Sequence, residues 1–262
     1  MTGNITAALA NIVRAVGLTL FIPALVAYFY GENSQFYFFT LYAIIVLVVG
    51  SLLYHKREIG EVTLTEAFII SSTGWLLVSF IGAIPYIMLA HMAPIDAYFE
   101  AMSGFTTTGM TVIADVESLP RSLLLWRALT QWVGGIGIIL FFLLFVSPSG
   151  LGVWRLYRAE AREEKALATT RETVKYMWKL YVIYTAACIL ALIFLAKLSP
   201  FDAVAHAFTV LSTGGFSTRN ASIGAFRNPA AEAILVVFMP VSYTHLRAHE
   251  TSLHLVCRLL LE

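Results

Sequence analysis

PIDAYFEAMSGFTTTGMTV, residues 94–112, recurs as PFDAVAHAFTVLSTGGFST at residues 200–218, at an offset of 106 residues and without a gap. The identical positions are Pro94, Asp96, Ala97, Ala101, Thr107 and Gly109 in the first copy and Pro200, Asp202, Ala203, Ala207, Thr213 and Gly215 in the second. Each copy lies between long apolar segments. A short helix and a Thr/Gly-rich stretch in that setting are typical of a cation selectivity filter. A pore on an axis needs several copies of the segment that lines it, so an internal repeat is expected of a pore-forming chain.

The composition predicts a polytopic helical membrane protein. Hydrophobic residues make up 59% of the chain and charged residues 13%, about half the charged share of a soluble domain. Cys188 falls in an apolar run and Cys257 near the C-terminus, so no disulfide framework is expected. The first apolar run has no small-residue cleavage site after it and is interpreted as a retained span rather than a signal peptide.

Apolar runs of about 20 residues suffice to cross a bilayer. Such runs predict spans at residues 12–30, 36–54, 67–90, 122–146 and 176–197, with the start of a sixth at 230–239. Pro23 is expected to kink the first span, which membrane helices tolerate where neighbours satisfy the freed carbonyl.

The basic residues orient these spans. His55, Lys56 and Arg57 follow the second span, and a second basic segment covers residues 155–179. Two spans separate the two segments, so both lie on one side, which the positive-inside rule assigns to the cytoplasm. The N-terminus is then cytoplasmic, and both copies of the repeat enter the membrane from outside.

The first copy has the chemistry of an ion filter. Residues 94–105 are too few to span and suit a half-helix that enters and returns. Non-helical backbone at membrane depth is tolerated where it lines a water-filled cavity. Backbone carbonyls at Thr107, Thr108 and Gly109 can replace the water around K⁺, and glycine accepts φ > 0 without steric cost. Neither TTTGMT nor STGGFS contains Asp or Glu, which favours carbonyl coordination over a carboxylate ring.

Three motifs carry a resemblance to a known family: FEAMSGFTTTGMTVI at 99–113, LPRSLLLWRALTQWVGGIGIIL at 119–140 and AFTVLSTGGFSTRNASIGAF at 207–226. They resemble the Trk/Ktr/HKT superfamily of potassium transporters, most closely the Trk-type membrane subunit. The resemblance implies an all-α polytopic fold of four helix–pore-loop–helix repeats around one pore, preceded by two extra helices. It divides this chain into two N-terminal helices at 1–60, a complete first repeat at 61–150, a cytoplasmic basic hairpin at 151–175 and an incomplete second repeat at 176–240.

The same resemblance implies the site residues and the function. Gly109 and Gly215 are the expected filter glycines of the two repeats, with Thr107, Thr108, Thr213 and Gly214 beside them. The implied function is K⁺ uptake through the pore-forming subunit of a Trk system. A sodium-permeable or non-selective transporter of the superfamily, or a non-functional fragment, is the alternative. Plant sodium-selective relatives carry serine in place of the first filter glycine, so Gly109 favours K⁺.

Partners and location follow from the family as well. The resemblance implies a cytoplasmic nucleotide-binding regulatory subunit, a homodimer, the plasma (inner) membrane, and no cofactor beyond the transported K⁺. The basic segment 155–179 is a candidate contact for the regulatory subunit, although the positive-inside rule by itself accounts for its charge.

Two departures from the family pattern stand out. The third and fourth repeats are absent, and with them half of the filter. After Met239 the expected apolar helix gives way to PVSYTHLRAHETSLHLVCRLLLE, and each Arg at mid-membrane would cost roughly 2.5–3.5 kcal/mol. Residues 241–262 are interpreted as translated sequencing-adapter read-through. A metal site at His245, His249 and His254 is not expected, since no other residues support one.

Several polar and glycine residues outside the filter stretches allow more than one role. Glu100, in the first half-helix, either concentrates cations at the outer mouth or is a buried, hydrogen-bonded group that fixes the helix. Gly134, Gly135 and Gly137 are expected to permit close helix packing. A secondary transporter with inverted repeats is disfavoured because both loops enter from the same side. No HExxH, nucleophile elbow or paired membrane carboxylates are present, so no enzyme is predicted.

Overall fold

The computed structural model describes residues 2–54, 63–146 and 163–239. This part of the chain folds into helices and connecting turns, with no β-strand in it. The elements are α1 Thr2–Thr19, α2 Phe21–Phe29, α3 Asn33–Leu53, α4 Leu64–Ala90, α5 Pro94–Phe105, α6 Arg121–Val146, α8 Glu163–Phe194, α9 Pro200–Leu211, the 3₁₀-helix η2 Ser222–Phe226 and a last helix Pro229–Met239. The predicted all-α, multi-pass membrane fold is confirmed.

Four segments in the described residues are long and apolar enough to cross a membrane: Asn4–Phe29, Asn33–Leu53, Thr65–Ala90 and Lys175–Phe194. The first begins earlier than the predicted residue 12, because the less apolar start of α1 packs against α3 and α4 and buries Ala7 and Ala10. Near the expected kink the helix is interrupted at Leu20, between α1 and α2, where the backbone keeps right-handed helical dihedrals. Pro23 has no N–H for the carbonyl four residues earlier, which explains a break at this point.

The described part of the predicted basic hairpin is helical. Residues 163–175 are the first turns of α8, one helix of 32 residues that continues into the fifth span. Good helix formers such as Ala, Glu, Lys and Leu fill this stretch, so the helix extends beyond the apolar run. The remaining hairpin residues, 151–162, and the tail at 241–262 lie outside the described residues.

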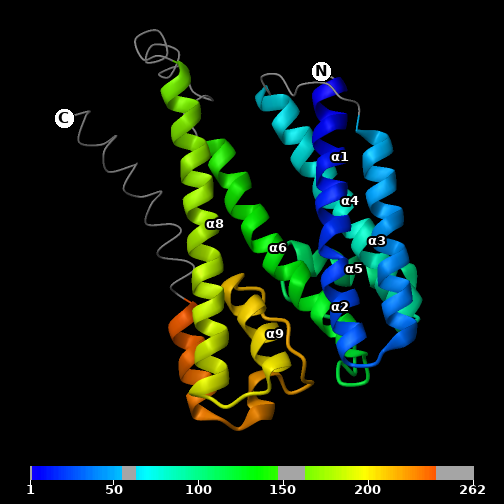
Figure 1. The fold of residues 1–262 in the computed structure, drawn as a ribbon, viewed down its shortest axis with the longest axis vertical. Coiled ribbons are helices and arrows are strands. Elements are labelled where there is room, and N and C mark those ends of the chain that lie inside the picture. Colours follow the sequence, from blue (N-terminus) through cyan, green and yellow to red (C-terminus); the bar gives the residue numbers. More distant parts are fainter. Residues whose placement is uncertain (1, 55–62, 147–162, 240–262) are drawn as a thin grey trace, which may run out of the picture.

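Helix α6 runs between two groups of helices (Figure 1). The first group is α1 to α5, and the second is α8, α9 and the last helix. α6 packs against both short helices, α5 and α9, while α8 covers α9 from the other side. Trp132 of α6 joins the two apolar cores, since its ring stacks on Phe208 with centroids 5.1 Å apart and lies 5.4 Å from Tyr181.

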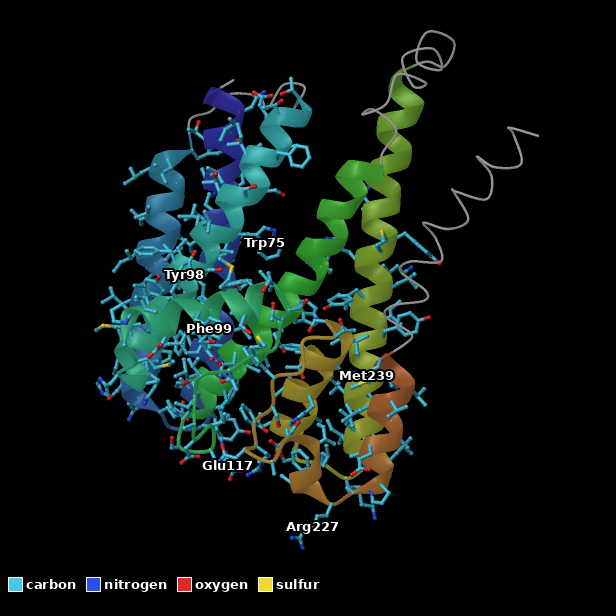
Figure 2. The ribbon with its side chains drawn as sticks, turned by 180° about the vertical axis from the view of Figure 1, so that it is seen from behind. Trp75, Tyr98, Phe99, Glu117, Arg227 and Met239 are labelled. Carbon is cyan, nitrogen blue, oxygen red and sulfur yellow. The ribbon has the colours of Figure 1, made fainter. Side chains whose placement is uncertain are left out.

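The helix ends lie at two opposite ends of the molecule. The N-terminus, the end of α3, the start of α4, the end of α6 and the start of α8 lie at one end (Figure 1). Glu117 and Arg227, from the segments that follow α5 and α9, lie at the opposite end (Figure 2). The helix ends that join the two basic segments therefore share a side, as the charge pattern predicted.

The turn between α2 and α3 is fixed to the start of α6. Glu32 accepts hydrogen bonds from the backbone N–H groups of Arg121 at 2.7 Å and Ser122 at 3.1 Å, so it satisfies two of the four free donors at that helix end. The Arg121 guanidinium lies 4.3 Å from the ring centroid of Tyr30. The two N-terminal helices thus set the position at which α6 begins.

Adjacent glycines let α6 approach both short helices. A Cβ at Gly134 would overlap backbone atoms of Phe105 at the end of α5. A Cβ at Gly135 would come within 2.8 Å of the Cβ of Ser212, just after α9. At Gly137 a Cβ would make an ordinary contact of 3.5 Å with Trp75. The prediction of close packing is confirmed for Gly134 and Gly135.

Gly134→Ala should lower the free energy of unfolding by about 1–3 kcal/mol, because backbone rather than a flexible side chain occupies the space of the new methyl group. Gly137→Ala is the matched control and should be neutral or slightly stabilising, since alanine favours a helix by up to ~1 kcal/mol. Thermal unfolding of the purified protein in detergent measures both, and equal melting temperatures for the two variants would contradict the packing argument.

Candidate ion-filter site

The two copies of the repeat form half-helices. α5 and α9 each have 12 residues, which is roughly 18 Å of helix against an apolar bilayer thickness of ~30 Å. Both begin with a proline, the favoured first residue of a helix. Asp96 and Asp202 lie in the first turns, where a carboxylate complements the helix dipole.

The backbone after each half-helix takes the same path. Thr107 and Thr213 both have φ 55°, and Gly109 and Gly215 have φ 78° and 82°. The N–H of Thr107 donates to the Gly104 carbonyl at 3.0 Å, and that of Thr213 to the Val210 carbonyl at 2.9 Å. The sequence repeat is therefore a repeat of backbone conformation, residue for residue.

A second pair of turn bonds matches as well. The N–H of Thr108 donates to the Ser103 carbonyl at 2.9 Å, and that of Gly214 to the Thr209 carbonyl at 2.8 Å. These bonds tie each strand, residues 107–109 and 213–215, to the last turn of its own half-helix. Because the sequence predicts that they line an ion filter, we call these two segments the filter strands.

Threonine at φ near +55° is strained. A β-branched residue is a rare outlier there, and such a conformation costs about 1–3 kcal/mol. The strain occurs at the same position of both copies. Surrounding contacts must hold it in place, and strain of this kind concentrates at functional sites.

The filter strands meet at Gly109 and Gly214. A Cβ on Gly109 would overlap the carbonyl oxygen of Gly214, and a Cβ on Gly214 would collide with the side-chain amide of Gln131. Around Gly215 a Cβ would meet nothing within 4 Å. The structure thus brings the predicted residues of the two copies together at the two glycines.

A buried ion pair holds the first copy. Glu100 of α5 is fully buried, and Arg127 of α6 is 2% exposed. Arg127 Nη2 lies 2.7 Å from Glu100 Oε1, and Arg127 Nε donates to the same oxygen at 2.9 Å. Glu100 also accepts from the Thr111 hydroxyl at 3.0 Å and the Val112 N–H at 3.1 Å. Of the two readings of Glu100, the structure supports the buried group that fixes the half-helix.

The same arginine reaches the second copy. Arg127 Nη1 donates to the Ser217 carbonyl at 3.1 Å, and the guanidinium carbon lies 4.1 Å from the ring centroid of Phe216. Two residues of the second loop are therefore held by the group that neutralises Glu100.

His206 replaces Glu100 in the second half-helix. Its ring nitrogens are hydrogen-bonded to the Asp202 carbonyl at 2.7 Å and the Ser217 hydroxyl at 3.0 Å. Burial works to raise the pKa of Asp202, but hydrogen bonds from Thr218 and Ser199 and the charge of Arg219 outweigh it and hold that pKa below its usual range. The second loop thus has its own buried network.

The segments beyond the filter strands are also joined. The side chain of Asn220 accepts from the Val116 N–H at 2.7 Å and donates to Asp115 at 2.8 Å. The N–H of Asn220 donates to Glu117 at 3.1 Å. Asp115 and Glu117 are exposed.

The described residues contain no group of three His, Cys, Asp or Glu side chains that could hold a metal ion. His245, His249 and His254 lie outside them.

A family model described as "TrkH: Cation transport protein" matches residues 34–245. The chain belongs to the TrkH family of cation transport proteins. It is 38% identical to the Trk system potassium uptake protein TrkH of Escherichia coli (strain K12) over 246 residues, which cover 88% of this chain and 50% of the relative. It is 36% identical to an uncharacterized cation transporter of Methanocaldococcus jannaschii, covering 89% of this chain and 48% of the relative.

The fold is similar to the crystal structure of the potassium transporter TrkH from Vibrio parahaemolyticus, with a TM-score of 0.78 and 31% sequence identity. The match covers 91% of this chain and 49% of that one. The chain thus spans about half the length of the TrkH relatives it matches. These relatives are ion transporters and not enzymes, in agreement with the sequence analysis.

Two residues of this site had no assigned role in the sequence analysis. Arg127 and Gln131 lie inside the quoted motif 119–140, in the otherwise apolar α6. A charged or amide side chain in a membrane helix is costly and usually functional, and that signal could have found both. Which loops they join could not be read from the sequence.

Gly109→Ala should destabilise the protein more than Gly215→Ala. Both substitutions force alanine to a positive φ, at roughly 1–2 kcal/mol, but only Gly109→Ala also drives a methyl group into the Gly214 carbonyl. Thermal unfolding in detergent compares the two directly. A loss at Gly215 equal to that at Gly109 would mean that the filter strands do not touch there.

Arg127→Leu should cost about 3–5 kcal/mol of folding free energy, because it leaves the Glu100 carboxylate buried without its counter-charge. The double variant Arg127→Leu/Glu100→Leu should recover part of that loss. Chemical or thermal unfolding of the single and double variants gives the coupling energy. A double variant as damaged as the sum of the two single variants would show that the ion pair contributes nothing.

Proposed function

We propose that this chain supplies two filter-lining segments to the pore of a Trk-type potassium uptake system. The ion is bound by backbone carbonyls of Thr107, Thr108 and Gly109 and, in the second copy, of Thr213, Gly214 and Gly215. The observation that carries the proposal is the strained backbone that occurs twice at an offset of 106 residues, with the same φ values at Thr107 and Thr213.

Potassium is favoured by three considerations. Two of the three relatives named above are described as a potassium uptake protein and a potassium transporter. Neither filter strand carries a carboxylate, so binding by neutral oxygens stays weak enough for release. The position at which plant sodium-selective relatives carry serine is Gly109 here, and Gly109 adopts a φ that suits glycine.

The assembly and the location belong to the same proposal. A four-fold filter needs four filter strands, and this chain supplies two. The remaining two would come from further repeats or from a second copy in a homodimer. The family supports a plasma (inner) membrane location, and the charge pattern supports a cytoplasmic N-terminus. The basic segment 155–179 is the proposed contact for a cytoplasmic nucleotide-binding regulatory subunit.

Uptake of K⁺ by a bacterial strain that lacks its own potassium systems tests the function. Cells that express the protein should grow at limiting K⁺ and take up radioactive rubidium above the empty-vector level. Gly109→Ser should lower uptake and reduce the preference for K⁺ over Na⁺, because a side chain there meets the Gly214 carbonyl.

Gly224→Ser is the matched control, since a Cβ at Gly224 meets nothing within 4 Å and its φ is not in the left-handed region. It should transport like the unmodified protein. If the protein reaches the membrane in normal amounts and uptake stays at the empty-vector level, the proposed function is wrong for this chain.

A further inference from the structure

Gln131 of α6 is buried with an exposed fraction of 0%. Its side-chain oxygen accepts the N–H of Phe216 at 3.1 Å. Its side-chain nitrogen has no hydrogen-bond partner in the part of the chain that the structure describes. A buried donor without a partner costs about 1–3 kcal/mol, so its retention next to the filter strands calls for a physical reason.

The orientation of this amide is fixed by the Phe216 bond. A backbone N–H can only donate, so the atom that receives it must be the side-chain oxygen, and the nitrogen must point the other way. The nitrogen is therefore placed by the structure rather than by an arbitrary choice between the two ends of the amide.

The free nitrogen lies against both filter strands. It is 2.7 Å from the position a Cβ would take on Gly214 and 3.8 Å from the corresponding position on Gly109. Only glycine at residue 214 leaves space for the amide. The polar groups at this point are backbone groups, among them the Gly214 carbonyl that lies against Gly109.

Arg127, one helical turn earlier, holds the neighbouring residues. Residues four apart share a helix face, and Arg127 binds the Ser217 carbonyl while Gln131 binds the Phe216 N–H. The two side chains thus fix consecutive residues of the second loop. Arg127 also fixes the first loop through Glu100, whereas Gln131 stands where the two filter strands touch.

We propose that Gln131 is a specificity-determining positioning residue, whose amide sets the spacing of the two filter strands at Gly109 and Gly214 and whose unpaired N–H group lies beside them. This rests on the proposed function. Selectivity in such a pore depends on the size of the site and on the field of its oxygens. A fixed amide packed against both strands sets the first, and the field of its unpaired N–H group tunes the second.

Gln131→Glu is the most informative substitution. It keeps the shape and the acceptor for the Phe216 N–H but, as a carboxylate, replaces the free donor with a second acceptor and a negative charge. The ratio of K⁺ to Na⁺ uptake should fall about tenfold, the change that corresponds to ~1.4 kcal/mol, while the amount of protein in the membrane stays normal. Gln131→Met keeps the approximate volume without either polar group and should lose selectivity as well.

Gln35→Glu is the matched control. It makes the same chemical change at the start of α3, whose main packing partners are α1, α2 and α4, and should leave the uptake ratio unchanged. Melting temperatures of all variants in detergent separate a selectivity effect from a folding defect, because a merely structural residue would change stability and total uptake without changing the ratio.

The outcomes separate the two proposals. If the unmodified protein does not take up K⁺, the proposed function fails. If it does, and both Gln131→Glu and Gln131→Met retain the original K⁺/Na⁺ ratio, Gln131 does not determine specificity and the inference is overturned. Should Gln131→Glu fail to fold, the ratio measured for Gln131→Met decides the question.

Discussion

The buried pair of Arg127 and Glu100 is the interaction on which the arrangement of the two loops depends. A charge in this environment is tolerated only when it is paired and hydrogen-bonded, and each partner here has several bonds. Arg127 also donates to Thr111 and to the Ser217 carbonyl. The side chain that neutralises Glu100 therefore also fixes the residues that follow both filter strands. Loss of the Arg127 guanidinium would free both loops.

The filter strands that this ion pair supports are themselves strained. Thr107 and Thr213 occupy a backbone region that threonine disfavours, and turn bonds to the half-helices keep them there. The proposed site of fixed oxygens requires a backbone that does not relax around each ion. The surrounding helices therefore have to supply the stability that the strands themselves lack.

The two N-terminal helices also help to hold the filter strands in place. Glu32 occupies the free N–H groups at the start of α6, and this helix carries Arg127, Gln131 and the glycines that contact both half-helices. The N-terminal helices thus fix the start of α6, and α6 in turn packs against both half-helices and the filter strands. Although the N-terminal helices precede the repeats in sequence, they pack as part of the first repeat.

The sequence by itself determined the membrane class, most of the helix bounds and the internal repeat, because apolar runs, half-helix lengths and Thr/Gly stretches are local properties. It identified Gly134 and Gly135 as packing positions for the same reason. It left the role of Glu100 open and assigned none to Arg127 or Gln131. Only the tertiary structure decided these. Glu100 acquires its role from Arg127, 27 residues away, and Arg127 and Gln131 acquire theirs from partners 90 and 85 residues away in the second loop. No local pattern encodes which carbonyl or N–H a buried polar side chain will meet.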